Sequence, residues 1–451
     1  MATSAEVHVM PTIFCIDLLT RLFKRRRMLG RRNLTWDTPV RHILGEEFEL
    51  CDDMRTQQTS LRDILAHKVG IPGYFGGFLT GFNMTRRQLI RKLRHLPASH
   101  PFRTHYIYNN YMYMLAGYIA EAIDDTGSTW EQLVRSRIFR PLRMTSAVFV
   151  DTSEHRWEGF AMPHIHSGGA TIPIDPEALF NVAPGGAAGS ICTNIIDMTK
   201  WVRFHLGTGA TPGGEQLVDS TLLADTHTEQ FNIPLKRLAT FQGRPEFPVA
   251  ISRFAYDLGW TTGLYRGYER VYHGGNIFGY DSQLWLLPGL NAGIVVLTNG
   301  PNDAAAVRAI ETILYYTTDL LAGETTWLNA TTACSFPAPW GKVGAATAPP
   351  DDEQDEGAEH ERPLADYVGR YGHYGLGSQE IDTAVYFRSS SSSASGSDVT
   401  QLVIPWMSPD VETVFLRDLD VDAVATATGV ALRAAVVCVV VVMATVASLL
   451  M

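Results

Sequence analysis

The sequence predicts an α+β domain in which helices flank an antiparallel sheet, followed by a small C-terminal β appendage. Two runs rich in large apolar and β-branched residues, Gln283–Leu287 and Ala292–Leu297, are separated by Pro288-Gly289-Leu290-Asn291, which is typical of a hairpin. An amphipathic helix is predicted directly after them over Asp303–Leu321. A second, strongly apolar helix is predicted over Tyr111–Ile123.

Local signals support each of these elements. Ser60 to Asp63 resembles a capping box at the start of a short helix, which Gly70 and Pro72 end. Apolar residues recur at helical spacing in the first long helix, at Met114, Leu115, Tyr118 and Ile119. In the second, one face is predicted to hold Val307, Ile310, Leu314 and Leu321. We therefore treat residues 34–323 as one domain.

Composition narrows the class of protein. The chain has 451 residues, of which 45% are apolar and 19% charged, so it can bury a large core. A net charge of -10 argues against a nucleic-acid partner, because such proteins normally carry a basic face. The five cysteines are scattered without the spacing of metal ligands. We expect no metal and no cofactor.

Residues 1–33 form an atypical N-terminal segment. The moderately apolar stretch Val7–Phe23 is interrupted by Asp17 and Arg21, and the basic run Lys24–Arg27 follows it rather than preceding it. A secretory signal has the opposite arrangement. A basic run is usually a solvated face, and the segment has no core pattern that we recognise. We therefore expect it to lie outside the domain that follows.

The C-terminal part is predicted to contain three segments. Residues 345–363 are an acidic, proline-containing linker, and residues 364–420 combine strand-like alternation with a serine-rich loop, as in a small partial β appendage. Residues 434–451 are apolar, uncharged and preceded by Arg433, which predicts a membrane segment: a tail anchor, a transmembrane end or the removable signal of a lipid-anchored protein. A buried terminal helix or strand is the alternative.

Glycosylation sequons bear on the side of the membrane. Three N-x-[ST] sequons begin at Asn33, Asn83 and Asn329, and they suit an extracellular chain, although one or two are expected by chance. We therefore expect a membrane protein and favour an extracellular domain.

Two motifs bear on chemistry. Tyr108-Asn109-Asn110 stands before the apolar helix, and His273-Gly274-Gly275 precedes the hairpin. Alone, each motif fits ordinary packing, capping or a close backbone approach. Further blocks share their order along the chain: Trp36–Val40, Leu61–His67 with Gly70–Pro72, Phe139–Met144, Pro184–Gly186, Leu258–Trp260 and Leu297–Asn299. Together these blocks resemble the serine β-lactamase-like family, which includes class C-type β-lactamases, esterases and peptidases related to penicillin-binding proteins.

This resemblance implies acyl transfer through a seryl intermediate, on a peptide, D-amino peptide, ester or lactam. By position, Tyr108 would relay the serine proton and Asn110 would orient the substrate. His273 stands where many relatives have lysine, and it would hydrogen-bond or polarise Tyr108. Gly274 and Gly275 would let the substrate backbone approach closely. Since a free phenol titrates near pH 10, Tyr108 would need a neighbouring positive charge to act as a base.

The nucleophile motif of the resembled family is missing from this sequence. No Ser-x-x-Lys occurs, and the stretch Thr12–Leu19, where the resemblance would place it, contains neither serine nor lysine. Cys15 has no lysine three residues later, which disfavours a cysteine substitute. The resemblance also implies sheet strands before the nucleophile, and we expect these N-terminal strands to be missing.

Three interpretations follow. We favour a truncated hydrolase-family chain whose catalysis is impaired. The alternative is a membrane-anchored pseudoenzyme that binds a ligand or partner through the retained cleft. An active enzyme with an unrecognised nucleophile ranks last, because loss of the nucleophile removes most of a covalent mechanism.

Overall fold

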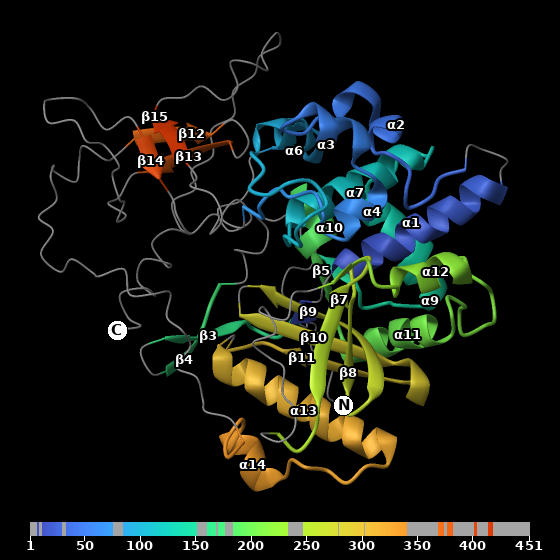
Figure 1. Cartoon of the computed structure of the whole chain (residues 1–451), viewed down its shortest axis with the longest axis vertical. Helices are drawn as coiled ribbons and strands as arrows, with labels where there is room; N and C mark the ends of the chain where they lie inside the picture. Colours follow the sequence, from blue (N-terminus) through green and yellow to red (C-terminus); the bar gives the residue numbers. More distant parts are fainter. Residues whose placement is uncertain are drawn as a thin grey trace, which may run out of the picture.

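The centre of the fold is a six-stranded antiparallel sheet with helices on both faces (Figure 1). The computed structural model describes residues 7–8, 11–28, 33–74, 84–150, 160–167, 170–175, 184–232, 247–277, 279–301 and 303–340, and four short strands between 369 and 417. The sheet order is β11-β10-β9-β8-β7-β6. Its strands are β6 (Phe231–Asn232), β7 (Ile251–Tyr256), β8 (Thr261–Tyr265), β9 (Tyr268–Ile277), β10 (Tyr280–Leu287) and β11 (Ala292–Thr298). The predicted α+β class is confirmed.

The predicted hairpin is the β10–β11 pair, in which Leu287 lies opposite Ala292 next to the turn. A short 3-10 turn, Pro288–Leu290, joins the strands, and Asn291 follows it with a φ of 46°. Asparagine tolerates this left-handed conformation because its short polar side chain can hydrogen-bond locally. The turn residues in the sequence therefore suit the backbone that the hairpin requires.

Alternate side chains of β10 pack in two different hydrophobic cores. Leu284 and Leu286 pack in the main hydrophobic core, whereas Trp285 and Leu287 pack in a second core with Ile310. This division follows from the period of two in a strand, which sends successive side chains to opposite faces. The sheet is consequently buried on both sides.

Helix α13 (Ala304–Ala322) covers one face of the sheet, and its orientation corrects part of the prediction (Figure 1). Ile310 and Leu314 are buried as expected, but Val307 and Leu321 are 44% and 48% exposed. Tyr315 is buried in their place, with its ring stacked at 5.3 Å on that of Tyr265. The predicted apolar face was too wide, because the helix contacts the sheet along a narrower stripe.

The other face of the sheet meets a group of helices packed around α7 (Asn110–Ile123), in which Met114, Leu115 and Ile119 are fully buried (Figure 1). Helix α4 (Leu61–Leu65) packs against α7 and begins at the predicted capping box. Ser60 Oγ accepts from the Asp63 N–H at 3.2 Å, and the Asp63 carboxylate accepts from the Ser60 N–H at 2.9 Å. Such a cap stabilises a helix by about 1 kcal/mol.

The remaining helices are α2 (Arg41–Leu44), α3 (Asp53–Gln58), α6 (Arg86–Lys92), α8 (Trp130–Val134), α9 (Arg140–Leu142), α10 (Gly186–Gly189), α11 (Ile195–Leu206), α12 (Ser220–Thr226) and α14 (Ala330–Ser335). Two smaller sheets complete this part. One has the order β1-β5-β2 and the other pairs β3 with β4. Their strands are β1 (Val7–His8), β2 (Val148–Phe149), β3 (His164–Ser167), β4 (Ala170–Pro173) and β5 (Ile191–Thr193).

The structure differs from expectation at residues 1–33, because helix α1 (Pro11–Met28) belongs to the main core. Phe14, Ile16 and Leu18 are fully buried, and α1 packs against α7 and α10. Asp17, which appeared to interrupt an apolar stretch, accepts a hydrogen bond from the Trp201 indole at 2.8 Å. The boundary at residue 34 therefore does not separate two packing units. The apolar pattern of this helix was not recognised in the sequence because Asp17 interrupts it, and the partner of Asp17, Trp201, lies far along the chain.

The basic run that follows is also not a simple solvated face. The Arg25 guanidinium lies 2.8 Å from the buried carboxylate of Asp124, and Arg26 donates to the Ile123 carbonyl at 3.2 Å. Ile123 is the last residue of α7, where the helix carries unpaired carbonyl groups and the negative end of its dipole. The two arginines therefore cap α7 from the neighbouring helix.

Four short strands lie within the predicted β appendage: β12 (Gly369–His373), β13 (Gly377–Ile381), β14 (Gln401–Val403) and β15 (Val414–Arg417). They pair antiparallel in the order β13-β12-β15-β14. The predicted linker at 345–363 and the predicted anchor at 434–451 lie outside the described residues. Among the helices that the structure does describe, none combines the length and apolarity needed to span a bilayer.

Candidate functional site

His273 lies on β9 and is buried on the face of the sheet that α1 covers. Its Nδ1 is 2.7 Å from the Gly274 carbonyl, which can only accept, so Nδ1 carries the proton. Nε2 therefore accepts from the hydroxyl of Tyr256 at 3.2 Å. Burial lowers the pKa of His273 to about 4, although the hydrogen bond to Gly274 opposes this shift. At neutral pH the imidazole is uncharged.

Tyr108 lies near His273, with 6.5 Å between the ring centroids, so the structure brings these two predicted site residues together. The Tyr108 ring is also 4.4 Å from that of His67. Burial, together with the neighbouring Tyr106, raises the pKa of the Tyr108 phenol. The phenol is therefore protonated at neutral pH.

His67 occupies the centre of the aromatic cluster, between Tyr108, Tyr113 and Tyr256. Its Nδ1 accepts from the Asn109 N–H at 3.1 Å, so the ring proton is on Nε2. Burial holds the pKa of His67 well below its usual range, and this ring too is neutral. Within the described residues, the buried Nε2 makes no hydrogen bond.

The two asparagines of the Tyr108 motif have different surroundings. Asn109 is buried, and its amide donates to the carbonyls of Ile71 and Pro72 at 3.0 and 2.9 Å while its oxygen caps α7. Asn110 is the first residue of α7 and is partly exposed. Asn109 is thus committed to holding the loop, whereas Asn110 is partly exposed, and its role in orienting a substrate stays a prediction.

Gly274 and Gly275 lie opposite Gln283 and Ser282 on β10. A Cβ added at Gly274 would overlap the amide of Gln283, so the Gln283 side chain covers this glycine. The sequence predicted that a substrate would approach the backbone of Gly274 closely, but in the structure the Gln283 side chain lies there. His273, Ser282 and Gln283 line a cavity of only about 20 Å³, which is room for roughly one water molecule.

The first turns of α1 lie against His273. Ile13 lines the same small cavity, and the following residues Phe14, Cys15 and Ile16 are completely buried. This is the stretch where the resemblance places the missing nucleophile. Burial raises the pKa of the Cys15 thiol to about 12, and a hydrogen bond with Trp130 offsets only part of that shift. The helix therefore lines the site with the apolar Ile13, and its Cys15 thiol is buried and un-ionised.

Four further residues belong to this site and were not assigned to it from the sequence: His67, Tyr256, Ser282 and Gln283. His67 stood inside a recognised sequence block, which is the one signal that could have identified it. The other three have no local signal, because strand pairing across β7 to β10 brings them together. Within the described residues, no three His, Cys, Asp or Glu side chains converge as ligands of a metal ion would.

Comparison with known proteins agrees with this architecture. A family model described as Beta-lactamase matches residues 27–317. Unguisins hydrolase ungD of Aspergillus violaceofuscus is 30% identical over 284 residues, and ungD' of Aspergillus campestris is 29% identical over 271. These matches cover 59% and 58% of this chain and 47% of either hydrolase. The chain thus spans about half the length of these curated relatives.

Solved structures show the same fold at lower identity. The octameric penicillin-binding protein homologue from Pyrococcus abyssi has a TM-score of 0.54 and 19% identity, over 72% of this chain and 67% of its own. The D-stereospecific amidohydrolase from Streptomyces sp. has a TM-score of 0.51 and 21% identity, over 67% and 85%. Since the family model spans the described core from the end of α1 to α13, the chain belongs to the beta-lactamase family of penicillin-binding-protein-like serine hydrolases.

Proposed function

We propose that this protein keeps the acyl-transfer cleft of its family but is impaired in the covalent step. The observation that carries the proposal is which residues α1 places beside His273. Where the resemblance places a serine and a lysine, the helix has Ile13, Phe14, Cys15 and Ile16, all buried. A covalent mechanism without its nucleophile typically loses about six orders of magnitude in turnover.

The protonation states of the site support the same conclusion. Proton relay by Tyr108 requires a phenolate, but burial and Tyr106 both raise its pKa. His273 and His67 are neutral near pH 7 and supply no positive charge to lower it. With a pKa of about 12, only about one Cys15 thiol in 10⁵ is ionised at pH 7, so it is a poor substitute nucleophile.

The substrate class follows from the family and its named relatives. Two relatives at 29–30% identity are called unguisins hydrolases, and the cavity at His273 is lined by the hydrogen-bonding side chains of Ser282 and Gln283, which suit an amide or ester. We therefore propose that the ligand is a small molecule or peptide with an amide, ester or lactam group. Because the match covers only 47% of either hydrolase, the proposal extends to this class of ligand and not to a particular substrate.

The test is covalent labelling. The purified chain is incubated with a fluorophosphonate and a fluorescent penicillin, beside an active penicillin-binding protein as the positive control. We expect no labelled adduct, and no hydrolysis of amide or ester substrates above the level of a His273→Gln variant. Labelling that maps by mass spectrometry to a serine or to Cys15, and is lost in Ser282→Ala or Cys15→Ser, would establish an active nucleophile and contradict the proposal.

A non-enzymatic binding role is the second candidate. This role is favoured by a cavity of about 720 Å³ beside the aromatic cluster. His273 is not one of the residues that line this cavity. Such a volume suits a small ligand, whereas the cavity at His273 does not. Ligand binding that is unaffected by His273→Gln would distinguish this role from residual catalysis.

Membrane attachment is a separate proposal that rests on the sequence of residues 434–451. This stretch is apolar, uncharged and preceded by Arg433. We expect the chain to sediment with membranes and to be released by detergent, and a variant lacking residues 434–451 to remain in the soluble fraction. Identical sedimentation of the two chains would contradict an anchor. Accessibility of the domain to added protease in intact cells would test the proposed extracellular side.

A further inference from the structure

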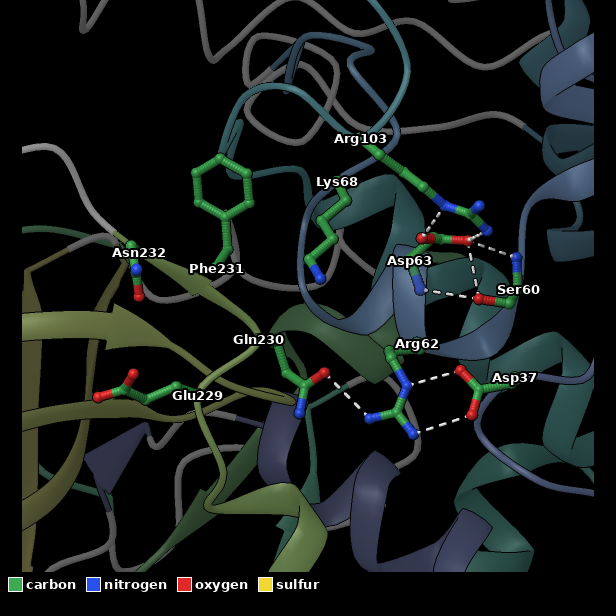
Figure 2. Close-up of a pocket in the computed structure, with 10 residues that line it drawn as sticks. All are labelled: Asp37, Ser60, Arg62, Asp63, Lys68, Arg103, Glu229, Gln230, Phe231 and Asn232. Carbon is green, nitrogen blue, oxygen red and sulfur yellow. Dashed lines mark hydrogen bonds and ion pairs between the residues drawn. The ribbon is translucent and has the colours of Figure 1, made fainter.

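A cavity of about 720 Å³ lies between the α4 segment and the edge strand β6 (Figure 2). This volume falls in the range of ligand-binding clefts. Side chains of both charges and one aromatic ring line it: Asp37, Ser60, Arg62, Asp63, Lys68, Arg103, Glu229, Gln230, Phe231 and Asn232. Neither Tyr108 nor His273 is among them.

Two of the three cations in this cavity are already paired. Arg62 makes two hydrogen bonds to the Asp37 carboxylate, at 2.7 and 3.1 Å, and a third to the Gln230 amide oxygen at 3.0 Å. Arg103 contacts both oxygens of Asp63, at 2.8 and 2.7 Å (Figure 2). These bidentate pairs fix the two guanidinium groups in the walls and satisfy most of their donors.

Lys68 is different. Its ammonium projects into the cavity, and it makes no hydrogen bond or ion pair with any described residue (Figure 2). The side chain is half-buried, and burial lowers its pKa, as do the positive charges of Arg62 and Arg103. Asp63 and Asp37 act in the opposite direction, but each is held by an arginine. A partly desolvated ammonium whose three donors meet no acceptor among the described residues is a strong site for an anion.

Glu229 does not neutralise this charge. Its carboxylate is directed away from the Lys68 ammonium and lies beyond Gln230 (Figure 2). It is exposed to solvent, and the largest causes of the Lys68 pKa shift are burial and the charges of Asp63, Arg62, Arg103 and Asp37. The Lys68 ammonium therefore has no direct partner among the described carboxylates of the lining and is open to an anion that enters the cavity.

The apolar wall of the cavity is the ring of Phe231 on β6. Its centroid is 6.4 Å from that of Tyr106, which in turn is 5.0 Å from Tyr256. These contacts hold the half-buried Phe231 ring against the aromatic cluster while part of it faces the cavity. A ligand that reaches Lys68 therefore also meets an aromatic surface.

We propose that this cavity binds a small organic carboxylate, with the carboxylate on the Lys68 ammonium and an apolar or aromatic group against Phe231. A single negative charge fits best, because Lys68 is the one cation of the cavity lining whose side chain has no partner among the described residues, whereas Arg62 and Arg103 are already paired with carboxylates. The inference is independent of whether the site at His273 performs acyl transfer.

The test compares two matched ligands. N-acetyl-L-phenylalanine carries the carboxylate, whereas N-acetyl-L-phenylalanine amide is its neutral counterpart, and calorimetry measures the binding of each to the purified chain. We expect the acid to bind at least about tenfold more tightly than the amide, because a charge-assisted hydrogen bond is lost in the amide. Equal affinities, or no binding of the acid at millimolar concentrations, would overturn the proposal.

Variants identify the residues. Lys68→Met should weaken binding of the acid about tenfold and leave binding of the amide unchanged, while Lys92→Met, the same charge change on α6 outside the cavity, should alter neither. Because Lys68 has no described partner, its replacement should not lower the melting temperature. Phe231→Ala should weaken the binding of both ligands. Unchanged affinity in Lys68→Met, or displacement of the acid by equimolar phosphate, would contradict the assignment.

Discussion

The hydroxyl of Tyr256 and Nε2 of His273 are joined by a buried hydrogen bond of 3.2 Å. Because Nδ1 of His273 donates to Gly274, the tyrosine must be the donor. The histidine that the sequence associates with Tyr108 is therefore held by a different tyrosine. This tyrosine comes from strand β7, two strands away from His273 on β9.

We expect Tyr256→Phe to destabilise the protein by about 1–3 kcal/mol, because it leaves the buried Nε2 of His273 without a donor. Urea unfolding followed by tryptophan fluorescence measures this loss. Tyr316→Phe, at a position that is 41% exposed on α13, is the matched control and should change the unfolding free energy by less than about 0.5 kcal/mol. Equal effects of the two substitutions would show that the Tyr256 hydrogen bond contributes nothing.

Two buried groups should give opposite pH dependences of stability. The folded pKa of His273 is about 4, below its unfolded value of about 6.5. Between these values the unfolded state binds more protons, so the unfolding free energy rises with pH, by at most about 1.4 kcal/mol per unit. This contribution is complete above the unfolded pKa. His273→Gln should therefore make the slope between pH 4 and 6.5 less positive.

Asp257 has the reverse sign. Burial raises its folded pKa from 3.8 to about 7, so between these values the folded state binds more protons. Its contribution therefore lowers the unfolding free energy as pH rises from 4 to 7, and Asp257→Asn should make the slope more positive. Urea unfolding at half-unit pH steps measures both variants. Slopes that change in the same direction would show that one of the two shifts is misassigned.

Helix α1 should contribute to stability like any other core element. Phe14 is fully buried, with its ring 4.6 Å from that of Trp201 and 5.6 Å from that of Phe139. We expect Phe14→Ala to cost about 3–5 kcal/mol, because it removes an aromatic ring and leaves a cavity. Met28→Ala, on the same helix but 76% exposed, should cost less than about 0.5 kcal/mol. A negligible effect of Phe14→Ala would show that α1 is not docked in solution.

Gly274 and Gln283 should behave as a coupled pair. The added Cβ of Gly274→Ala would overlap the Gln283 amide, and we expect a cost of about 1–3 kcal/mol from overpacking. In the Gln283→Ala background the same substitution should cost much less, which a double-mutant cycle measures as an interaction energy. Gly289→Ala is the control, because an added Cβ there meets no atom within 4 Å. Additive effects at positions 274 and 283 would contradict the packing.

The hairpin, the capping box and helix α7 were predictable because their causes are local. The Pro288–Asn291 turn residues, the Ser60 and Asp63 cap and the apolar spacing of α7 are all read within a few residues of chain. Helix α1 was not predictable in this way. Asp17 interrupts its apolar pattern, and the reason, a hydrogen bond from Trp201, comes from a residue far away in the sequence.

The sequence by itself determined the family, the order of its motifs and the absence of Ser-x-x-Lys, because these depend only on residue identity and spacing. The tertiary structure alone decided what surrounds those motifs. It placed Ile13 beside His273, gave His273 its donor in Tyr256, and left the Lys68 ammonium facing a cavity without a described partner. Protonation state and partner choice depend on burial and on contacts between distant segments, and a linear pattern does not contain that information.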